Sequence, residues 1–482
     1  MRVLDKFMPE KVFYYFEEIS KIPRGSGNTA AVSDYCVQFA QERGLECYQD
    51  ELNNVIIIKE ATPGYENSDT VMLQGHLDMV CEKTPQSNHD FEKDPIKLMI
   101  EDDWITADST TLGGDDGIAI AYALAILDSD NIEHPRLECV FTIDEEVGMD
   151  GAKYLDCSRL RAKYLINLDS EDEGIFLTSC AGGVRYNITL PVQREKVCGT
   201  EASFTIKNLT GGHSGAEIDK ERANAVLLMG RALSEIGKAV DIRITDLTGG
   251  FKDNAIPREC SAGLIINEND LEKAKSAIAA VMDVYKDEYA VSDPEMDYDF
   301  MVDDINEANA LTADTTEKML FMLNMIPNGV QAMSMDIKGL VETSLNLGIA
   351  YIDEENINFK IAVRSSVTSR KRRICDKLEL LTTYLGGSFT SEGEYPAWVY
   401  KRDSRLREIM CSAYEDLFGK PAKVEAIHAG LECGLISEKM PGIDIVSLGP
   451  DMKDIHTTEE RLSISSTKRV WELVLEVLKR LK

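Results

Sequence analysis

The sequence of 482 residues lacks the features that mark membrane and secreted proteins. No run of about eighteen apolar residues occurs, so no membrane-spanning helix is predicted. The first twenty residues lack an apolar segment followed by a small-residue cleavage site, which argues against a signal peptide. We expect an amphipathic helix there instead. Low-complexity segments and short repeats are also absent.

Paired cysteines and positive charge are scarce as well. The eleven cysteines are scattered, without any Cys-x-x-Cys pair, which is typical of reduced thiols and predicts a cytoplasmic protein. Lys and Arg number 52 against 84 Asp and Glu, giving a net charge of −32. We therefore expect neither nucleic acid nor an anionic membrane as a partner, because both attract basic surfaces.

The sequence is long enough for more than one hydrophobic core. Within residues 1–183, an apolar helix near 113–128 follows buried strands near 53–59 and 71–80. Another strand is expected near 137–143. This alternation predicts an α/β domain with a mostly parallel sheet covered on both faces.

Residues 184–392 differ in pattern, because their strands alternate polar and apolar residues. Helices are expected at 222–237 and 271–289. This pattern predicts an inserted α+β domain, either single or divided into two subdomains. The α/β pattern returns at 393–482, so the first domain is predicted to be interrupted by the second.

The segment VMLQGHLDMV, residues 71–80, places His76 and Asp78 within an otherwise apolar strand. Side chains two positions apart on a strand share a face. Burying such groups unpaired costs about 2–7 kcal/mol for a polar group and more for a charge. The two side chains therefore need partners.

Acidic residues follow further apolar segments at the positions where strands or turns end. They are Asp115 and Asp116 in TTLGGDDGIAIAYA, Glu145 and Glu146 in FTIDEEVGMDGA, and Asp169 in LINLDSEDEG. Functional groups of open α/β sheets gather at the carboxyl ends of the strands. Carboxylates clustered there would repel one another unless cations neutralised them, and two zinc ions could share imidazole and carboxylate ligands. Each acidic pair taken alone is more often a helix cap or part of a solvated loop.

Six histidines occur, and four of them lie in glycine-rich or acidic contexts. These are His76 in GHLD, His213 in GGHSG, His428 in HAGLECG and His456 in DIHTTEE. A single buried histidine is usually only a hydrogen-bonded core residue. Their combination with the acidic segments favours a metal site.

The segments GHLDMV, LGGDDG, DEEVGMDGA, INLDSEDEG and DIHTTEERL closely resemble the motifs of the M20 metallopeptidases. More narrowly, they resemble the aminoacyl-histidine dipeptidases. The resemblance extends from SKIPRGSGN near the start to DIHTTEERLSI near the end. It implies a zinc-peptidase-like catalytic domain with an inserted lid domain. It also implies hydrolysis of dipeptides, preferentially Xaa-His substrates such as carnosine, by a metal-bound hydroxide.

The resemblance implies a role for each acidic motif. The implied metal ligands are His76, Asp115, Glu146, Asp169 and His456. Asp115 would bridge two divalent ions, with zinc the first expectation and cobalt or manganese as alternatives. Glu145 would be the general base that activates water. Asp78 would accept a hydrogen bond from the His76 ring and fix its tautomer.

The resemblance also implies roles for residues of the lid. His213 would stabilise the oxyanion, and Asn254 and Arg364 would bind the C-terminal carboxylate of the substrate. A guanidinium group suits this task because it can bind a carboxylate through two hydrogen bonds. Gly430 would lie in a loop at the rim of the active site and contribute to substrate binding. A turn role for His213, or ordinary structural hydrogen bonds for Asn254 and Arg364, are the alternatives.

Two positions depart from the family pattern. Asp116 follows the bridging aspartate where a neutral residue is expected, which leaves open which of the pair bridges, and HTTEER replaces a Ser-Pro form after the last histidine. No role is assigned to His428 or Glu432 of HAGLECG.

Other functions remain open at this point. A tripeptidase or an N-acyl amino acid amidohydrolase would use the same metals with a different lid. A non-catalytic metal-dependent binding protein, or a purely structural acidic protein, would not need Glu145 as a base. The lid could form a homodimer, or its two halves could imitate a partner within one chain.

Overall fold

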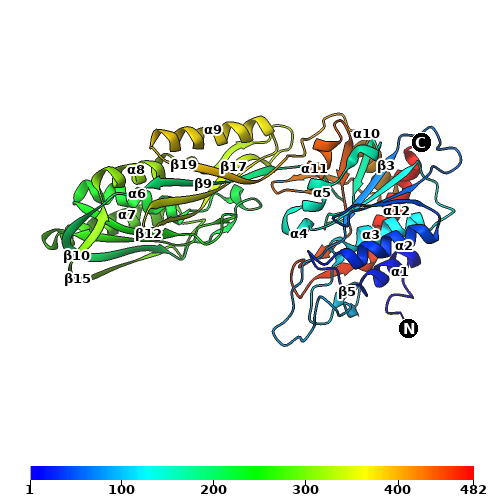
Figure 1. The fold of residues 1–482 in the computed structure, drawn as a ribbon, viewed down its shortest axis with the longest axis horizontal. Coiled ribbons are helices and arrows are strands. Elements are labelled where there is room, and N and C mark those ends of the chain that lie inside the picture. Colours follow the sequence, from blue (N-terminus) through cyan, green and yellow to red (C-terminus); the bar gives the residue numbers. More distant parts are fainter. Residues whose placement is uncertain (1) are drawn as a thin grey trace. The chain divides into compact units, whose positions relative to one another are not determined.

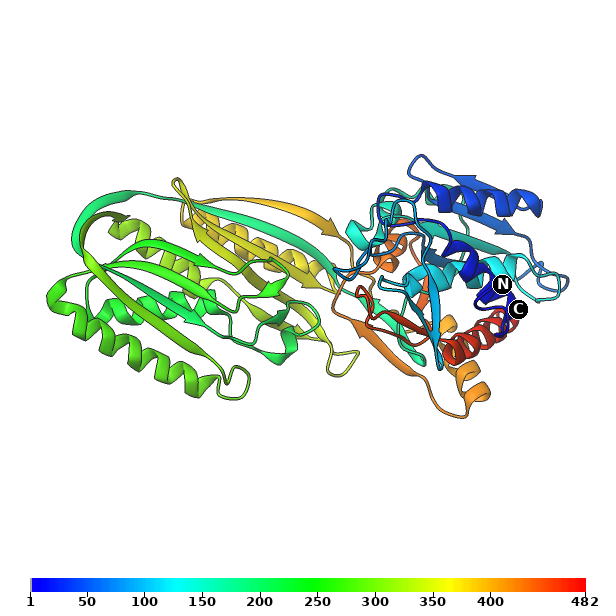
Figure 2. The same ribbon diagram turned by 90° about the horizontal axis from the view of Figure 1, so that it is seen from below.

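The structure is a computed structural model that describes residues 2–482. The chain forms two compact units. Unit 1 comprises Met1–Cys180, Trp398–Ala426 and Leu431–Lys482, and unit 2 comprises Ala181–Ala397 and Ile427–Gly430. In Figure 2, unit 1 combines blue and cyan segments with orange and red ones, whereas unit 2 is mainly green and yellow. None of the helices within residues 2–482 has the length and apolarity to cross a bilayer.

Unit 1 is built on an eight-stranded sheet with the order β1-β2-β6-β3-β7-β21-β8-β20. In that order the strands are Glu46–Gln49, Val55–Lys59, Leu137–Thr142, Val71–His76, Tyr164–Asn167, Asp444–Ser447, Ile175–Cys180 and Lys423–Ile427. The central strands β6, β3, β7 and β21 are parallel, whereas β1, β2 and β8 pair antiparallel with their neighbours. The α/β class is confirmed, but the sheet is mixed, with its parallel part confined to the centre. The flanking β1 and β2 form a hairpin, which needs only a short connection.

Helices cover this sheet, and all residues of its central strands are buried. The main helices are α1 Glu10–Ile19, α2 Ala30–Glu42, α3 Gly114–Leu127, α10 Arg405–Phe418, α11 Glu432–Lys439 and α12 Ile464–Arg480. Every residue of α3 is buried, as expected of a helix that is apolar on all sides. The helices predicted near the N-terminus and at 113–128 are therefore present.

The predicted strand 71–80 is shorter than the sequence indicated. Strand β3 ends at His76, so His76 and Asp78 do not share a strand face. Arg24 Nη1 donates to the carbonyl oxygens of Leu77 and Asp78, at 2.9 Å each. These carbonyls therefore accept from a buried side chain rather than from a neighbouring strand, and the strand does not continue past His76.

A small four-stranded sheet completes unit 1, with the order β22-β23-β5-β4. Its strands are Met452–Lys453, Arg461–Ser463, Trp104–Ala107 and Leu98–Glu101. The short helices α4 Glu145–Gly148 and α5 Asp150–Tyr154 follow β6 directly. This arrangement brings the C-terminal segment with His456 into the same unit as the N-terminal strands.

Unit 2 contains a nine-stranded antiparallel sheet with the order β15-β10-β14-β12-β17-β18-β9-β19, and β16 pairs with β17. In that order the strands are Asp297–Leu311, Arg194–Lys207, Cys260–Ile266, Ile242–Gly249, Val341–Ile352, Asn356–Ser365, Gly182–Pro191 and Ser388–Tyr395, and β16 is Gly329–Met333. A two-stranded pair joins β11 Gly212–His213 to β13 Ala255–Ile256.

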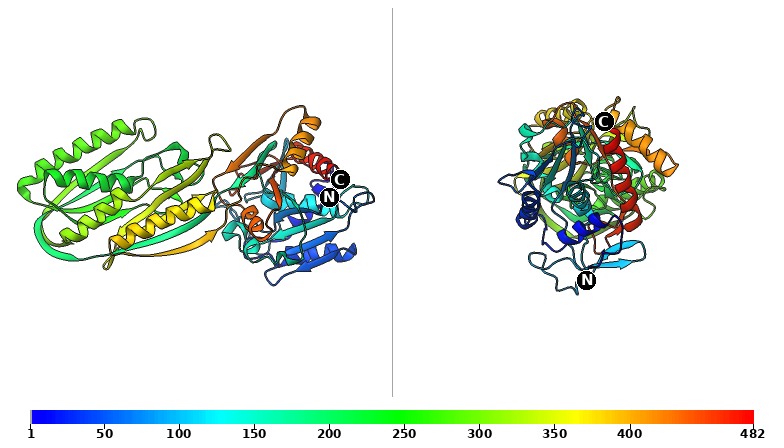
Figure 3. Two further views of the ribbon diagram at one scale, coloured as in Figure 1. Left: turned by 90° about the horizontal axis from the view of Figure 1, so that it is seen from above. Right: turned by 90° about the vertical axis from the view of Figure 1, so that its right-hand side faces the viewer.

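Four helices pack on the large sheet of unit 2 (Figures 1 and 3). They are α6 Ala225–Ala239, α7 Leu271–Glu288, α8 Ala313–Met325 and α9 Thr368–Tyr384. In β10, buried residues alternate with partly exposed ones from Thr200 onward, as expected of a sheet with one covered face. The large sheet and one main apolar core extend through the unit.

We expect Gly75→Ala to destabilise unit 1, because α3 approaches β3 at this glycine. An added Cβ would lie 2.5 Å from Ala119 Cβ and would also meet the Asp116 carboxylate. Overpacking of this kind typically costs about 1–3 kcal/mol. The measurement is urea-induced unfolding. The control is Gly237→Ala, in helix α6 with open space around it, which should instead stabilise its helix by about 0.5–1 kcal/mol. A Gly75→Ala protein as stable as the wild type would contradict the packing argument.

Candidate metal centre and active site

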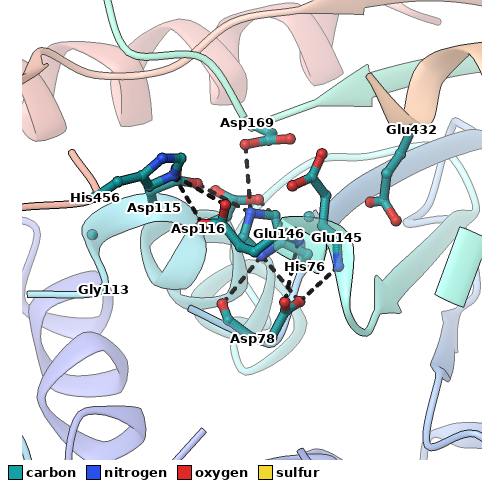
Figure 4. A network of polar contacts seen from close by, with 12 residues as sticks. His76, Asp78, Gly113, Asp115, Asp116, Glu145, Glu146, Asp169, Glu432 and His456 are labelled. Carbon is teal, nitrogen blue, oxygen red and sulfur yellow. Dashed lines mark hydrogen bonds and ion pairs between the residues drawn. The ribbon is translucent and has the colours of Figure 1, made fainter. Parts of the chain in front are cut away.

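The candidate ligands of unit 1 lie at the carboxyl ends of its parallel strands. His76 is the last residue of β3, Glu145 and Glu146 begin the helix α4 that follows β6, and Asp169 lies two residues after β7. The register aligns these ends, because His76 pairs with Thr142 and Gln74 with Asn167. Figure 4 shows their side chains directed toward a common region.

Asp115 lies between the two histidines of the cluster. Its Oδ1 is 3.1 Å from His76 Nε2, and its Oδ2 is 3.2 Å from His456 Nε2. His456 Nε2 also lies 3.0 Å from Glu146 Oε2. A carboxylate that offers one oxygen to each of two ligand sets has the arrangement expected of a bridge between two metals.

Two groups of donor atoms are compact enough to hold a metal ion. The atoms of His76, Asp116 and Asp169 lie within 4.8 Å of one another, as do those of His76, Asp115 and Glu146. Imidazole nitrogen combined with carboxylate oxygen is a donor set that suits zinc. Both groups contain His76, and since His456 lies beside Asp115 and Glu146 as a second imidazole donor, the residues present fit a pair of divalent cations.

Asp116 is the departure from the family pattern, and it is completely buried. Its Oδ2 accepts from the backbone N–H of His76 at 3.2 Å, while its Oδ1 is buried without a hydrogen-bond partner. Asp115, by contrast, contacts both histidines. The geometry thus favours Asp115 over Asp116 as the bridge.

Asp78 has more contacts than the sequence indicated. Its Oδ1 lies 3.4 Å from His76 Nδ1, but its backbone oxygen is closer to that nitrogen, at 3.1 Å. Its carboxylate also accepts from the backbone N–H groups of Glu145 and Glu146, at 3.1 and 3.4 Å, and from Ser26 Oγ at 2.8 Å. Asp78 therefore holds the start of α4 as well as the His76 ring.

Burial and neighbouring charges raise the pKa values of several side chains in the cluster. Burial and the neighbouring Asp116 raise the pKa of Asp169 well above its usual range. Burial, then the charges of Glu432 and Glu146, raise the pKa of Glu145 to about 8. Hydrogen bonds with Asp115 and Glu146 raise the pKa of His456 to about 10. So much unbalanced negative charge is what bound cations would neutralise.

Two buried residues that sequence reasoning did not assign hold the backbone of the site. The Glu460 carboxylate accepts from the N–H groups of Leu112, Gly113 and Gly114, at 2.7, 3.0 and 2.8 Å. Arg24 donates to the carbonyl of Gly113, besides those of residues 77 and 78. Both lie within quoted motifs, HTTEER and SKIPRGSGN, but neither motif reveals which backbone segment its side chain holds.

Glu432 was left without a role, and it belongs to unit 1 next to this cluster. It is completely buried, and its Oε2 accepts from Gln74 Nε2 and Thr142 Oγ1, at 2.6 Å each. Burial is the main cause that raises its pKa to about 7. In Figure 4 it lies on the side of Glu145 away from His456.

The residues for which the resemblance implies a lid role belong to unit 2, where Gly215 lies close to His213, Arg364 and His428. A Cβ at Gly215 would lie 2.8 Å from the His428 carbonyl oxygen, 3.0 Å from the His213 ring and 3.3 Å from Arg364 Nε. Asn254 lies beside this segment, since its carbonyl accepts from Ser214 N–H at 2.9 Å. The sequence candidates of unit 2 are therefore close together.

The two histidines of unit 2 have lowered pKa values. Burial, then the positive charge of Arg364, lowers the pKa of His213, and the same causes lower that of His428 to about 3. His213 Nδ1 accepts from the N–H groups of Gly215 and Ala216, at 3.3 and 3.0 Å. A neutral His213 with this contact carries its hydrogen on Nε2. His428 Nε2 lies 2.7 Å from Ser344 Oγ.

Comparison with known proteins shows the family to which the chain belongs. The model of peptidase family M20/M25/M40 matches residues 72–480. The chain belongs to this family. It is 37% identical to the cytosol non-specific dipeptidase of Escherichia coli, over 100% of this chain and 99% of that protein.

Solved structures of this family are also similar. The crystal structure of an aminoacylhistidine dipeptidase from Vibrio alginolyticus matches with a TM-score of 0.94 and 34% identity, over 99% of this chain and 98% of that one. The aminopeptidase PepT of Bacillus cereus matches with a TM-score of 0.58 and 18% identity, over 98% and 99% of the two chains, which shows a shared fold alone. The M20 fold inferred from the sequence is thus confirmed.

We expect Glu460→Gln to weaken zinc binding about tenfold to a hundredfold, as loss of outer supporting contacts does at other metal sites. The amide would present an N–H₂ group to backbone donors that now face a carboxylate oxygen. The measurement is competition for zinc against a coloured chelator. Glu459→Gln is the matched control, since Glu459 is exposed beside it. Equal zinc affinity in both variants would show that Glu460 does not support the site.

Proposed function

We propose that this protein is a metal-dependent dipeptidase with a preference for Xaa-His substrates. One observation carries the proposal. Among residues 2–482, the Glu145 carboxylate has no hydrogen-bond or ion-pair partner, whereas its neighbour Glu146 contacts His456. A general base must be free in this way. The names of the Escherichia coli and Vibrio alginolyticus relatives support dipeptides as the substrate class.

His76, Asp115 and Asp169 would hold one divalent ion, and Asp115, Glu146 and His456 the other. Zinc is our first choice, with cobalt or manganese as alternatives. Such ions lower the pKa of water from about 15.7 toward 7 and polarise a carbonyl group. The short distances from His76 Nε2 to Asp115 and Asp169, and from His456 Nε2 to Asp115 and Glu146, support this ligand set.

Glu145 would accept a proton from the attacking water and return it to the departing amine. Burial and the charges of Glu432 and Glu146 raise the pKa of this carboxyl, which makes it a stronger base toward the attacking water. Asp78 would keep Glu145 in place through the backbone N–H at the start of α4. Its contact with His76 would fix the ring that carries a metal.

In unit 2, His213 would donate its Nε2–H to the oxyanion that forms as water attacks the peptide carbonyl. The hydrogen bonds that Nδ1 accepts support this tautomer. Arg364, Asn254 and Gly430 would bind the C-terminal end of the dipeptide. A well-placed oxyanion donor contributes about 3–4 kcal/mol to catalysis.

The relatives differ in the specificity that their names state, since one is called non-specific and the other an aminoacylhistidine dipeptidase. The preference for a C-terminal histidine is therefore the most specific part of the proposal. We also propose a cytoplasmic location, which the name of the Escherichia coli relative supports, and a homodimer formed through unit 2. Light scattering would reveal the oligomeric state.

A substrate panel tests the proposed activity. After EDTA treatment the protein should be inactive, and zinc, cobalt or manganese should restore hydrolysis of carnosine and other Xaa-His dipeptides, because the carboxylate cluster cannot activate water without a cation. Tripeptides and N-acetyl amino acids, tested in the same assay, show whether the protein acts instead as a tripeptidase or as an N-acyl amino acid amidohydrolase. Chromatographic detection of free histidine measures the reaction. Faster cleavage of acetyl-amino acids than of any dipeptide would refute the dipeptidase assignment.

We expect Glu145→Gln to bind two metal ions but to lose turnover by about 10²–10⁴, because it removes the base and no proposed ligand. Elemental analysis and the kcat for a dipeptide are the measurements. His76→Ala is the contrasting variant, since it should lose metal as well as activity. A Glu145→Gln enzyme with wild-type kcat would exclude Glu145 as the base.

A further inference from the structure

Three adjacent strands of unit 2 bring Arg364 and Tyr395 to opposite sides of one glycine. Arg364 on β18 pairs with Gly183 on β9, and Gly183 also pairs with Tyr395 at the end of β19. Residues in register across neighbouring strands direct their side chains to the same face. Gly183 has no side chain, so the face between Arg364 and Tyr395 is open.

The Tyr395 side chain fills this opening. A Cβ built at Gly183 would lie 2.5 Å from both Cζ and Oη of Tyr395, too close for any side chain. Across the glycine, Arg364 Nη1 donates to the Tyr395 hydroxyl oxygen at 2.9 Å. Only glycine at position 183 allows this contact.

Gly430 packs against the same ring. A Cβ at Gly430 would lie 2.7 Å from Tyr395 Cε2. The backbone at the base of the ring is held too, because the buried Lys371 Nζ donates to the Tyr395 carbonyl at 3.0 Å. The position of the tyrosine is therefore fixed by two glycines and a lysine.

Arg364 itself is only partly buried and lacks a counter-ion. Within residues 2–482 it forms no ion pair with a carboxylate, although the chain carries a net charge of −32. Its Nε is buried without a hydrogen-bond partner. The Tyr395 hydroxyl is neutral, so it orients the guanidinium without cancelling its charge, and the group stays available for an anion.

We propose that Tyr395 is a positioning residue that fixes the Arg364 guanidinium to receive the C-terminal carboxylate of the substrate. This inference rests on the proposed dipeptidase function. An arginine side chain that is already ordered loses less conformational freedom when its ligand binds. Tyr395 thereby sets the preference for peptides that end in a free carboxylate.

The test compares Tyr395→Phe with the wild type on Ala-His and on Ala-His amide, which lacks the carboxylate. The ring remains between the two glycines in this variant, and only the hydroxyl is lost. We expect the KM for Ala-His to rise about three- to tenfold, as for the loss of one hydrogen bond, with kcat changed by less than about twofold. The kinetic constants for the amide should not change. Tyr186→Phe is the matched control, because Tyr186 lies in the same unit on β9 and donates to Glu379 instead.

A double-mutant cycle separates positioning from general packing. In the Arg364→Ala background, Tyr395→Phe should cause no further loss, because the tyrosine acts through the arginine. Gly183→Ala should reproduce the rise in KM by displacing the ring. The proposal is overturned if Tyr395→Phe behaves as the wild type, impairs the amide and the free dipeptide equally, or weakens the Arg364→Ala enzyme further. Failure of the proposed function would be evident earlier, as absence of dipeptide hydrolysis by the metal-loaded wild type.

Discussion

Mutual repulsion among buried carboxylates is the constraint on which the rest of unit 1 depends. Asp115, Asp116 and Asp169 lie together at the carboxyl edge of the sheet, and burial raises the pKa of the latter two well above the usual range. Such a cluster is unfavourable by itself, since like charges in a low dielectric repel strongly. It becomes favourable when cations bind between the oxygen atoms. The stability of this edge and its chemistry thus depend on the same ions.

The scaffold meets this constraint mainly through hydrogen bonds to the backbone of the segments that carry the candidate ligands. Glu460 binds the N–H groups of the turn before α3, and Arg24 binds carbonyl groups of that turn and of the bend after β3. The Glu460 carboxylate accepts from N–H groups, and the Arg24 guanidinium donates to carbonyl groups. Each fixes a segment that bears candidate ligands without using a ligand atom. Asp78 acts similarly on α4, where its carboxylate accepts from the N–H groups of Glu145 and Glu146. The side chains of the candidate ligands therefore remain free for metal and water.

The sequence predicted the parts of this arrangement that depend on local pattern. An apolar run that ends in His or Asp is visible in one dimension, so β3, β7 and α3 and the donor residues beside them could be located. The bend at Asp78 could not, because it depends on Arg24, a residue more than fifty positions earlier. Glu460 acts on a turn that lies 348 residues away at Leu112. The contact between Arg364 and Tyr395 requires the strand order β18-β9-β19, which no local pattern encodes.

Metal chemistry alone does not distinguish a dipeptide with a free C-terminal carboxylate from its amide, because both present the same type of scissile amide. Discrimination must come from groups that recognise the ends of the substrate. This chain has a large excess of carboxylates. An arginine that pairs with none of them is energetically unfavourable unless an anion from outside the chain binds to it. Arg364 meets that description, and its nearest polar support is a neutral hydroxyl. A carboxylate in place of Tyr395 would hold the guanidinium equally well but would cancel the charge that attracts the substrate. The choice of a tyrosine, reached across a glycine, keeps the arginine both ordered and cationic.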